Sequence, residues 1–183
     1  MTGNGRTRDG GTGSDVTGDN MRFDIRDGAY GKAVFAGERI PAGTLIAPFT
    51  GPYLSYAETN ADTYALQIGP DLYIGESGGV DDLFNHSCDP NAWVKVQGRS
   101  AELRALRDIL PGEQICFDYS TIMDEDDFTM RCLCGSSRCR GLITDGRNLP
   151  ADVWDRYVDL GILPGYVKES RVHGGPSRLR TAR

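Results

Sequence analysis

Past its first twenty residues, the chain alternates short apolar runs with glycine, proline and polar residues. Each run is only a few residues long and is bounded by turn-forming residues. Runs of this length and spacing are typical of short β-strands joined by tight turns. The pattern therefore predicts a β-rich domain with strands at residues 23–25, 33–36, 44–47, 92–96 and 101–106.

Two further segments complete this outline. Residues 97–100 have the composition of a hairpin turn, and residues 108–113 form a turn that delivers another strand at 114–119. Only residues 151–160 show apolar positions at helical spacing, and Pro150 stands at the entrance of that segment. We expect one C-terminal helix packed on the sheets.

Length and composition set the number of domains. A chain of 183 residues with 39% hydrophobic residues can bury one core and is too short for two ordinary domains. Residues 1–20 are almost free of apolar side chains and are expected to be a disordered leader. Residues 171–183 carry arginines among glycine, proline and serine and are expected to be a flexible basic tail. Neither a secretory signal nor a membrane span is recognisable, so an intracellular, soluble protein is expected.

The charge of the chain bears on its partner. A net charge of −6 argues against a nucleic-acid-binding surface over the whole molecule and is compatible with a basic partner. The acidic run at residues 124–127 has two interpretations. It is either a solvated loop or a rim that attracts a basic substrate.

Five cysteines in a chain without an export signal make a disulfide framework improbable. Cys132, Cys134 and Cys139 offer three thiolates within eight residues, a spacing that suits one metal ion. Structural zinc normally takes four ligands in a tetrahedron, so the fourth must come from elsewhere. Cys116 lies between Ile115 and Phe117, where a cysteine usually acts as a small apolar side chain.

Three blocks carry a resemblance to a known family. They are Asn-His-Ser-Cys-Asp-Pro-Asn at 85–91, Gly-Glu-Gln-Ile-Cys-Phe-Asp-Tyr-Ser at 112–120 and the cysteine segment at 132–139. In residue type, order and spacing the chain resembles SET-domain protein lysine methyltransferases, more weakly back to about residue 23. The resemblance implies a mainly β fold of several small curved sheets with a pseudoknot. It divides the chain into a SET domain, a post-SET zinc segment and a helical extension, at residues 21–122, 123–145 and 146–170.

The resemblance also implies a binding site for S-adenosylmethionine. Asn85 is expected to hold the cofactor through its amide and His86 largely through its backbone. The cofactor loop is expected at Tyr30, Gly31, Lys32 and Ala33, where Ala33 replaces the second glycine of the family's Gly-x-Gly. That change matters only if residue 33 must adopt a positive φ. Leu133 is expected to lie against the adenine.

Methyl transfer to a lysine requires a neutral amine held in line with the methyl group, which favours a narrow, dry, aromatic channel. By resemblance, Tyr119 is the catalytic tyrosine and Tyr64 the second channel tyrosine. Phe117 occupies the position that sets how many methyl groups fit, and a phenylalanine there implies di- or trimethylation.

The same resemblance assigns Cys88 as the fourth zinc ligand beside Cys132, Cys134 and Cys139. No cysteine precedes Cys88, so the pre-SET zinc cluster of many histone methyltransferases is absent from this sequence. Two other departures concern the substrate side: Asp82, Leu83 and Phe84 stand before Asn85, and residues 49–52 read Phe-Thr-Gly-Pro.

These observations predict a lysine methyltransferase that acts on a basic protein segment such as a histone tail or a histone-like protein, without direct contact to nucleic acid or membrane. It would be nuclear in a eukaryote or a host cell, and cytoplasmic in a bacterium. Two alternatives remain open. One is a non-catalytic peptide- or cofactor-binding module with the same fold, for which Ala33 and Asp82 are the only indications. The other is a small zinc-stabilised interaction domain.

Overall fold

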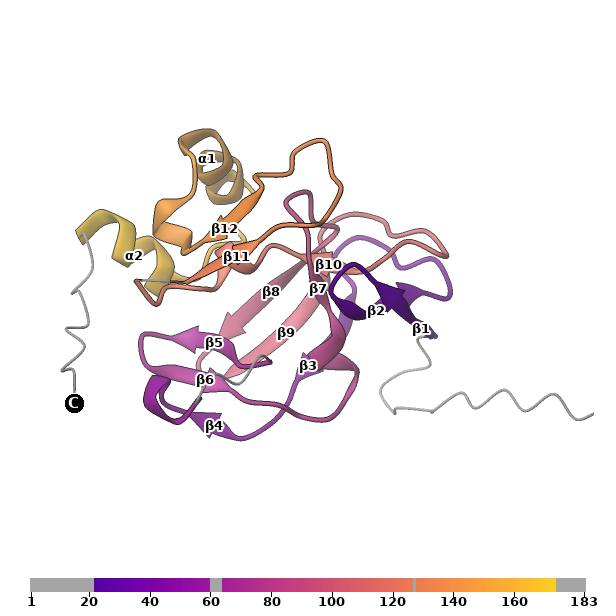
Figure 1. The fold of residues 1–183 in the computed structure, drawn as a ribbon, viewed down its shortest axis with the longest axis horizontal. Coiled ribbons are helices and arrows are strands. Elements are labelled where there is room, and N and C mark those ends of the chain that lie inside the picture. The colour runs from indigo at the N-terminus through magenta and orange to yellow at the C-terminus, as the bar shows by residue number, and fades with distance from the viewer. Residues whose placement is uncertain (1–21, 60–63, 127, 174–183) are drawn as a thin grey trace, which may run out of the picture.

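A computed structural model describes residues 22–59, 64–126 and 128–173 of the chain (Figure 1). Twelve short strands and two α-helices, joined by turns, loops and short 3-10 helices, make up this part. The strands are β1 (Phe23–Gly28), β2 (Gly31–Ala36), β3 (Leu45–Phe49), β4 (Tyr53–Leu54), β5 (Leu66–Gly69), β6 (Leu72–Ile74), β7 (Asn85–His86), β8 (Ala92–Gln97), β9 (Ser100–Ala105), β10 (Cys116–Phe117), β11 (Thr129–Arg131) and β12 (Leu142–Thr144). The helices are α1 (Ala151–Asp159) and α2 (Gly165–His173).

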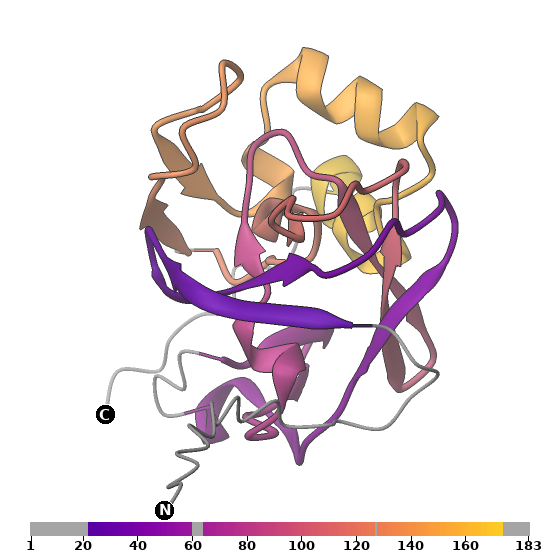
Figure 2. The same cartoon turned by 90° about the vertical axis from the view of Figure 1, so that its right-hand side faces the viewer.

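The strands form five small sheets, which confirms the predicted β-rich fold. Two sheets have three strands, in the orders β3-β9-β8 and β4-β6-β5. The pairs β1-β2, β7-β10 and β11-β12 form the other three. Figure 2 shows the β1-β2 hairpin crossing in front of the other sheets.

The β8-β9 hairpin follows the predicted pattern. Ala101, Leu103 and Ala105 alternate inward along β9 and are buried, as one face of a half-buried strand requires. Gln97 pairs with Ser100, so the turn between them has two residues. Gly98 in this turn has φ +61°, a conformation that glycine adopts without strain.

The predicted strand at residues 114–119 is wrong in its extent. Gln114 makes only an isolated bridge to Phe35, and β10 then covers just Cys116 and Phe117. From Tyr119 to Thr121 the backbone turns into a 3-10 helix, η3. The segment changes its pairing partner and then its conformation, although its apolar pattern is continuous.

The C-terminal part contains two helices, so the prediction of a single helix is wrong. Helix α1 lies where it was expected, and α2 extends past the predicted start of the flexible tail at residue 171. The two helices share an apolar cluster that also packs against Trp93 of β8 and Leu106. This cluster lies beside the β3-β9-β8 sheet, which is called the central sheet below. The buried members of this cluster are Leu149, Tyr157, Ile162, Leu163 and Val167.

Two earlier expectations fall outside the described residues. They are the leader at residues 1–20 and the last ten residues of the predicted tail. Within the described part, no helix combines the length and apolar character needed to cross a membrane.

Candidate functional site

Two strands of two residues each bring the Asn-His and Phe-Asp-Tyr motifs of the sequence together. Strands β7 and β10 pair in parallel, with Asn85 opposite Cys116 and His86 opposite Phe117. The Ser87 amide then donates to the Phe117 carbonyl at 3.0 Å. The Asn-His and Phe-Asp-Tyr motifs, about 30 residues apart in sequence, therefore share one backbone ladder.

Tyr119 is fixed at both ends of the residue. Its amide donates to His86 Nδ1 at 3.2 Å and its hydroxyl donates to the Phe84 carbonyl at 3.0 Å. Its ring lies 4.9 Å from that of Phe117, centroid to centroid. Burial raises the pKa of Tyr119 above its usual range, so the phenol stays protonated at neutral pH.

Tyr119 and Phe117 line the larger of two cavities, which has a volume of about 800 Å³. Phe49, Phe84 and Tyr64 also line it, and Phe49 meets the Phe117 ring edge to face. Acidic side chains border the same cavity at Asp81, Asp82 and Glu125. The predicted channel residues Tyr64, Phe117 and Tyr119 thus surround one largely aromatic space.

A smaller cavity of about 300 Å³ lies against the predicted cofactor residues His86 and Leu133. Tyr30 lines both cavities. The Tyr30 hydroxyl accepts a short hydrogen bond from the Leu133 amide and donates to Cys132 Sγ at 3.6 Å. Burial raises the pKa of Tyr30 to about 12, so this hydroxyl remains a donor. Tyr30 therefore joins the cofactor loop to the cysteine segment.

The other residues of the predicted cofactor loop contact strand β7 through the Lys32 carbonyl and do not line either cavity. Asn85 is buried, and its amide donates to the Lys32 carbonyl at 3.0 Å. Gly31 has φ +99°, which only glycine adopts readily. Ala33 is fully buried in β2 and is absent from the positive-φ residues, so alanine fits there without strain. The Lys32 side chain points to Asp27, and neither it, Gly31 nor Ala33 lines a cavity described here.

His86 links the tyrosine to the cysteines. Burial lowers the pKa of His86 to about 4, although the nearby Asp118 carboxylate opposes the shift, so the imidazole is neutral. Because Nδ1 accepts the Tyr119 amide, the ring hydrogen lies on Nε2, which faces Cys88 Sγ at 3.3 Å. Both ring nitrogens are thus in use.

The cysteines of the two motifs meet beside His86. The ligand atoms of His86, Cys88, Cys132 and Cys134 all lie within 4.8 Å of one another. Cys139 is within hydrogen-bonding range of Cys132 and Cys134. Burial alone would raise the pKa of Cys134, but hydrogen bonds from backbone amides, including that of Ser136, bring it down to about 7.

This donor set suits zinc, which prefers thiolate and imidazole ligands in a tetrahedron. Cys116 is buried, and burial raises the pKa of its thiol to about 12, as expected for an apolar position. The fit supports the cysteine set and leaves Cys116 outside it.

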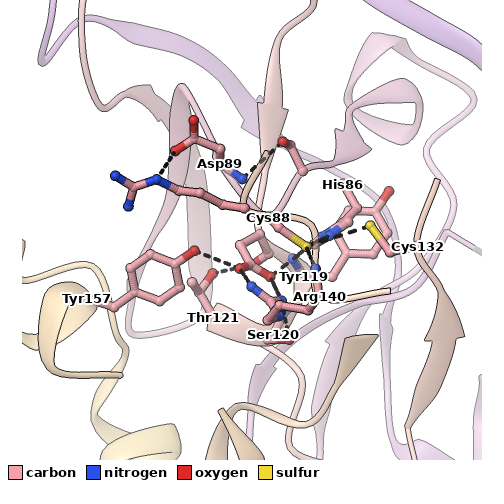
Figure 3. Close-up of polar contacts among 12 residues, drawn as sticks. His86, Cys88, Asp89, Tyr119, Ser120, Thr121, Cys132, Arg140 and Tyr157 are labelled. Carbon is pink, nitrogen blue, oxygen red and sulfur yellow. Dashed lines mark hydrogen bonds and ion pairs between the residues drawn. The ribbon is translucent and has the colours of Figure 1, made fainter. Parts of the chain in front are cut away.

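Sequence reasoning missed Asp118, Arg140 and Tyr157. Arg140 and Tyr157 both bind the buried carboxylate of Asp118, the residue before Tyr119. Figure 3 shows Arg140 beside Tyr119 and the Tyr157 hydroxyl pointing toward them. Asp118 lies inside the motif at 112–120, and Arg140 directly follows Cys139. Their places beside expected site residues were the only indication in the sequence that they belong to the site. Nothing in the helical pattern around Tyr157 indicated that its hydroxyl reaches this site.

The acidic run matches neither of its two interpretations as a whole. Asp124 pairs with Arg147 at 2.7 Å and accepts a hydrogen bond from Ser170, so it is part of the packed structure. Asp126 also pairs with Arg147, whereas Glu125 borders the large cavity. Asp127 lies outside the described residues. Among the three described residues of the run, Glu125 is the one that borders the large cavity.

The Asp82 departure has a structural account. Its carboxylate accepts hydrogen bonds from the amides of Ser77 at 3.1 Å and Gly78 at 2.7 Å. Asp82 thereby closes the turn before the 3-10 helix Val80–Leu83, at the border of the large cavity. Neither Asp82 nor Ala33 disturbs the arrangement around Tyr119.

Comparison with known proteins agrees with this arrangement. A family model described as SET domain matches residues 31–120. A Cryptococcus neoformans protein named "Histone-lysine N-methyltransferase, H3 lysine-4 specific" is 31% identical over 139 residues, which are 66% of this chain and 9% of that protein. The "Probable histone-lysine N-methyltransferase set-23" of Caenorhabditis elegans is 30% identical over 141 residues, 64% of this chain and 57% of that protein.

Among solved structures, the "crystal structure of KRYPTONITE in complex with mCHG DNA and SAH" is similar with a TM-score of 0.59 and 26% identity. The match covers 68% of this chain and 29% of that one. The chain thus spans less than two thirds of the relatives it matches. With its paired Asn-His and Phe-Asp-Tyr motifs, its aromatic cavity and these matches, the chain belongs to the SET-domain family.

Proposed function

We propose that this protein is an S-adenosylmethionine-dependent lysine N-methyltransferase that acts on a basic protein segment. The observation that carries the proposal is the placement of Tyr119. Its protonated hydroxyl binds the carbonyl of Phe84, the residue directly before the Asn-His strand, and Tyr119 lines the large aromatic cavity. Tyr30 lines both this cavity and the smaller one. Such an arrangement lets a lysine side chain and a methyl donor approach each other from two sides.

Several residues would hold the cofactor. His86 of β7 and Tyr30 line the smaller cavity, and Leu133 offers an apolar surface there for the adenine. Asn85 lines the larger cavity and ties the loop at Lys32 to β7. S-adenosylmethionine, when bound, supplies the methyl group from its sulfonium. Lys32 and Ala33 are proposed to contribute only through the backbone shape of the loop.

The chain's own residues would prepare the lysine. The aromatic wall formed by Phe49, Phe117 and Tyr119 disfavours the ammonium form, so the amine enters neutral after losing its proton to solvent. Because Tyr119 Oη donates to the Phe84 carbonyl, its lone pairs remain to accept an N–H of the amine. Tyr119 would orient the nucleophile rather than remove its proton.

The products and the partner follow from the walls of the cavity. Phe117 has no hydroxyl with which to hold a water molecule, so we propose di- or trimethylation. Glu125 and Asp82 at the cavity and the net charge of −6 favour a basic polypeptide over nucleic acid. The related proteins carry histone-lysine methyltransferase names, and one solved structure contains an H3(1-15) peptide, which makes a histone tail the proposed substrate. A histone substrate would place the protein in a nucleus.

Four thiolates are proposed to hold one zinc ion: Cys88, Cys132, Cys134 and Cys139. We exclude His86 from this set because both of its ring nitrogens already have partners. The ion would serve as a structural clip that keeps Leu133 at the smaller cavity.

The test is transfer of labelled methyl groups from S-adenosylmethionine to histone-tail peptides. The full chain should label a peptide with one lysine and not its lysine-to-arginine counterpart, and added duplex DNA should neither be bound nor be required. Cofactor binding without transfer to any basic protein would contradict the proposal and favour the non-catalytic module.

A further inference from the structure

Asp118, directly before Tyr119, carries a fully engaged buried carboxylate. Asp118 is 1% exposed, and its carboxylate receives four hydrogen bonds. Arg140 donates through Nη1 at 2.5 Å and Nη2 at 2.8 Å, the Tyr157 hydroxyl at 2.7 Å and the Ser120 amide at 3.0 Å. A charge-assisted fork of this kind fixes a carboxylate in one orientation.

The orientation of this carboxylate bears on the backbone of Tyr119. Asp118 is the N-cap of η3, the single turn of helix that begins at Tyr119, and it caps through the bond from the Ser120 amide. The Tyr119 amide and hydroxyl are held by His86 and by the Phe84 carbonyl. The Tyr119 carbonyl also accepts from the amides of Ile122 at 3.1 Å and Met123 at 3.0 Å. The Asp118 cap is therefore one of several attachments that set where the Tyr119 hydroxyl lies.

Two of the residues that donate to Asp118, Arg140 and Tyr157, come from outside the matched SET region, which ends at residue 120. Arg140 is 22 residues and Tyr157 is 39 residues downstream of Asp118. The Arg140 amide also donates to Cys88 Sγ at 3.3 Å. The Tyr157 ring is 1% exposed within the apolar cluster of α1 and α2. Asp118 thus connects the cysteine segment and helix α1 to one turn of backbone.

Tyr157 provides what Arg140 alone does not. Asp118 Oδ2 receives one bond from Arg140 and one from Tyr157, whereas Oδ1 serves Arg140 and the Ser120 cap. Without the Tyr157 hydroxyl, the Asp118 carboxylate keeps its ion pair with Arg140 but loses the second donor to Oδ2. Its rotation, and with it the cap, then becomes less defined.

We infer that Tyr157 is a positioning residue that places the Tyr119 hydroxyl for methyl transfer through the Asp118 carboxylate, with Arg140 as its partner in this role. Helix α1 is then part of the working site and not only a cover for the central sheet. The effect on turnover rests on the proposed function, whereas the effect on the Tyr119 backbone does not.

The experiment compares Tyr157→Phe with Tyr166→Phe in the full chain. Both variants lose one hydroxyl from a tyrosine of the C-terminal helices. Tyr166 donates to the carbonyls of Gln67 at 3.1 Å and Ile122 at 2.6 Å and does not bind Asp118. The unfolding free energies of the two variants, measured with denaturant, should fall by similar amounts.

Their kinetics should differ. Tyr157→Phe should lower kcat about tenfold, the scale of a small misplacement of a reacting group, with peptide KM and cofactor Kd within about twofold of wild type. Tyr166→Phe should keep kcat within about twofold. Equal kcat losses in the two variants, or no loss in Tyr157→Phe, would overturn the inference and leave Tyr157 a structural residue.

A second readout is independent of turnover. Hydrogen exchange at the Tyr119 and Ser120 amides should accelerate about tenfold in Tyr157→Phe and remain near wild type in Tyr166→Phe. If the wild-type protein transfers no methyl group, the proposed function fails and hydrogen exchange alone tests the positioning role. Faster exchange in Tyr157→Phe would then support that role, and unchanged exchange would refute it.

Arg140→Lys keeps the positive charge but not the two-pronged contact, and it should show the same exchange effect. If Tyr157→Phe does not fold, Arg140→Lys serves as the test variant in its place. Unchanged exchange and kcat in Arg140→Lys would then count against the inference.

Discussion

Tyr119 presents a hydroxyl that is already committed to one carbonyl oxygen. The bond to Phe84 at 3.0 Å and the raised pKa leave this hydroxyl with accepting lone pairs and a retained proton. A residue of this kind orients and does not abstract, so its removal should affect rate far more than binding.

Tyr119→Phe should therefore lower kcat by about 100-fold or more, because a misoriented amine loses the near-attack geometry. Loss of the hydrogen bond to Phe84 should cost only about 1 kcal/mol of unfolding free energy. Cofactor affinity, measured by calorimetric titration, should stay within about twofold. A variant with wild-type kcat would remove Tyr119 from the proposed mechanism.

Phe117→Tyr should shift the products toward monomethyl lysine. Phe117 is 3% exposed and faces both Phe49 and Tyr119, so a new hydroxyl there has to find a partner inside the cavity. A water molecule held by that hydroxyl would take the space of a methyl group. Mass spectrometry of a peptide with one lysine checks this, and a wild-type protein that stops at monomethyl lysine would contradict it.

Arg140→Met should be strongly destabilising, because it leaves the buried Asp118 carboxylate without its counter-charge. Breaking a buried pair on one side costs about 3–5 kcal/mol of unfolding free energy. Denaturant titration measures the loss. A cost below about 1 kcal/mol, the scale of a solvent-exposed ion pair, would mean that water reaches the Asp118 carboxylate in the folded protein.

At the scale of elements, the cysteine segment and the cofactor loop act together. The Tyr30 hydroxyl touches both the Leu133 amide and Cys132 Sγ. Metal binding beside Cys132 should therefore stabilise the position of Leu133 at the smaller cavity. Cofactor affinity then depends on the metal, although no cysteine need touch the cofactor.

Metal analysis should give one zinc ion per chain, lost on replacing Cys88, Cys132, Cys134 or Cys139 by serine. Cys116→Ser should retain the ion, because Cys116 is buried and lies outside the group of ligand atoms that His86, Cys88, Cys132 and Cys134 form. Removal of zinc by a chelator should weaken S-adenosylmethionine binding while circular dichroism of the sheets changes little. Unchanged affinity after confirmed zinc loss would separate Leu133 from the cofactor site.

How much of these elements the sequence predicts depends on what each residue pattern encodes. The β8-β9 hairpin was predicted because alternation and a glycine turn are local signals. The end of β10 at Phe117 was not predicted. An apolar pattern shows which face of a segment is buried, but it does not show which strand is its partner. Helix α2 was missed because Ser170, one of its buried positions, is polar and bonds Asp124.

The site divides in the same way. The positions of Asn85, His86, Tyr119 and the cysteines were predicted by resemblance, and the structure brings them together, whereas their roles stay predictions. Tyr157 was out of reach, because its hydroxyl contact depends on how α1 packs on the sheet. Long-range contacts of this kind leave no periodic trace in a sequence.

At the scale of the whole molecule, the two C-terminal helices complete the core. They cover Trp93 and Leu106 beside the central sheet, and they supply Tyr157 to Asp118. A chain that ends at residue 145 should therefore expose apolar surface, bind a hydrophobic dye and lose cooperative unfolding. A melting temperature within a few degrees of the longer chain would show instead that the SET region is self-sufficient.

The connection from Asp118 to Tyr157 also sets an order of events during synthesis. A ribosome makes Asp118 first and Tyr157 39 residues later, a delay of about 2–8 s at about 5–20 residues per second. Arg140 follows Asp118 after 22 residues and Tyr157 after 39, so the nascent carboxylate lacks its counter-charge for the first part of this interval and the Tyr157 donor for all of it. The turn that begins at Tyr119 therefore lacks its final geometry until Tyr157 is in place. We therefore expect the proposed methyl-transfer site to mature only after helix α1 has emerged, so that a nascent chain passes through this stage before it could act on a substrate.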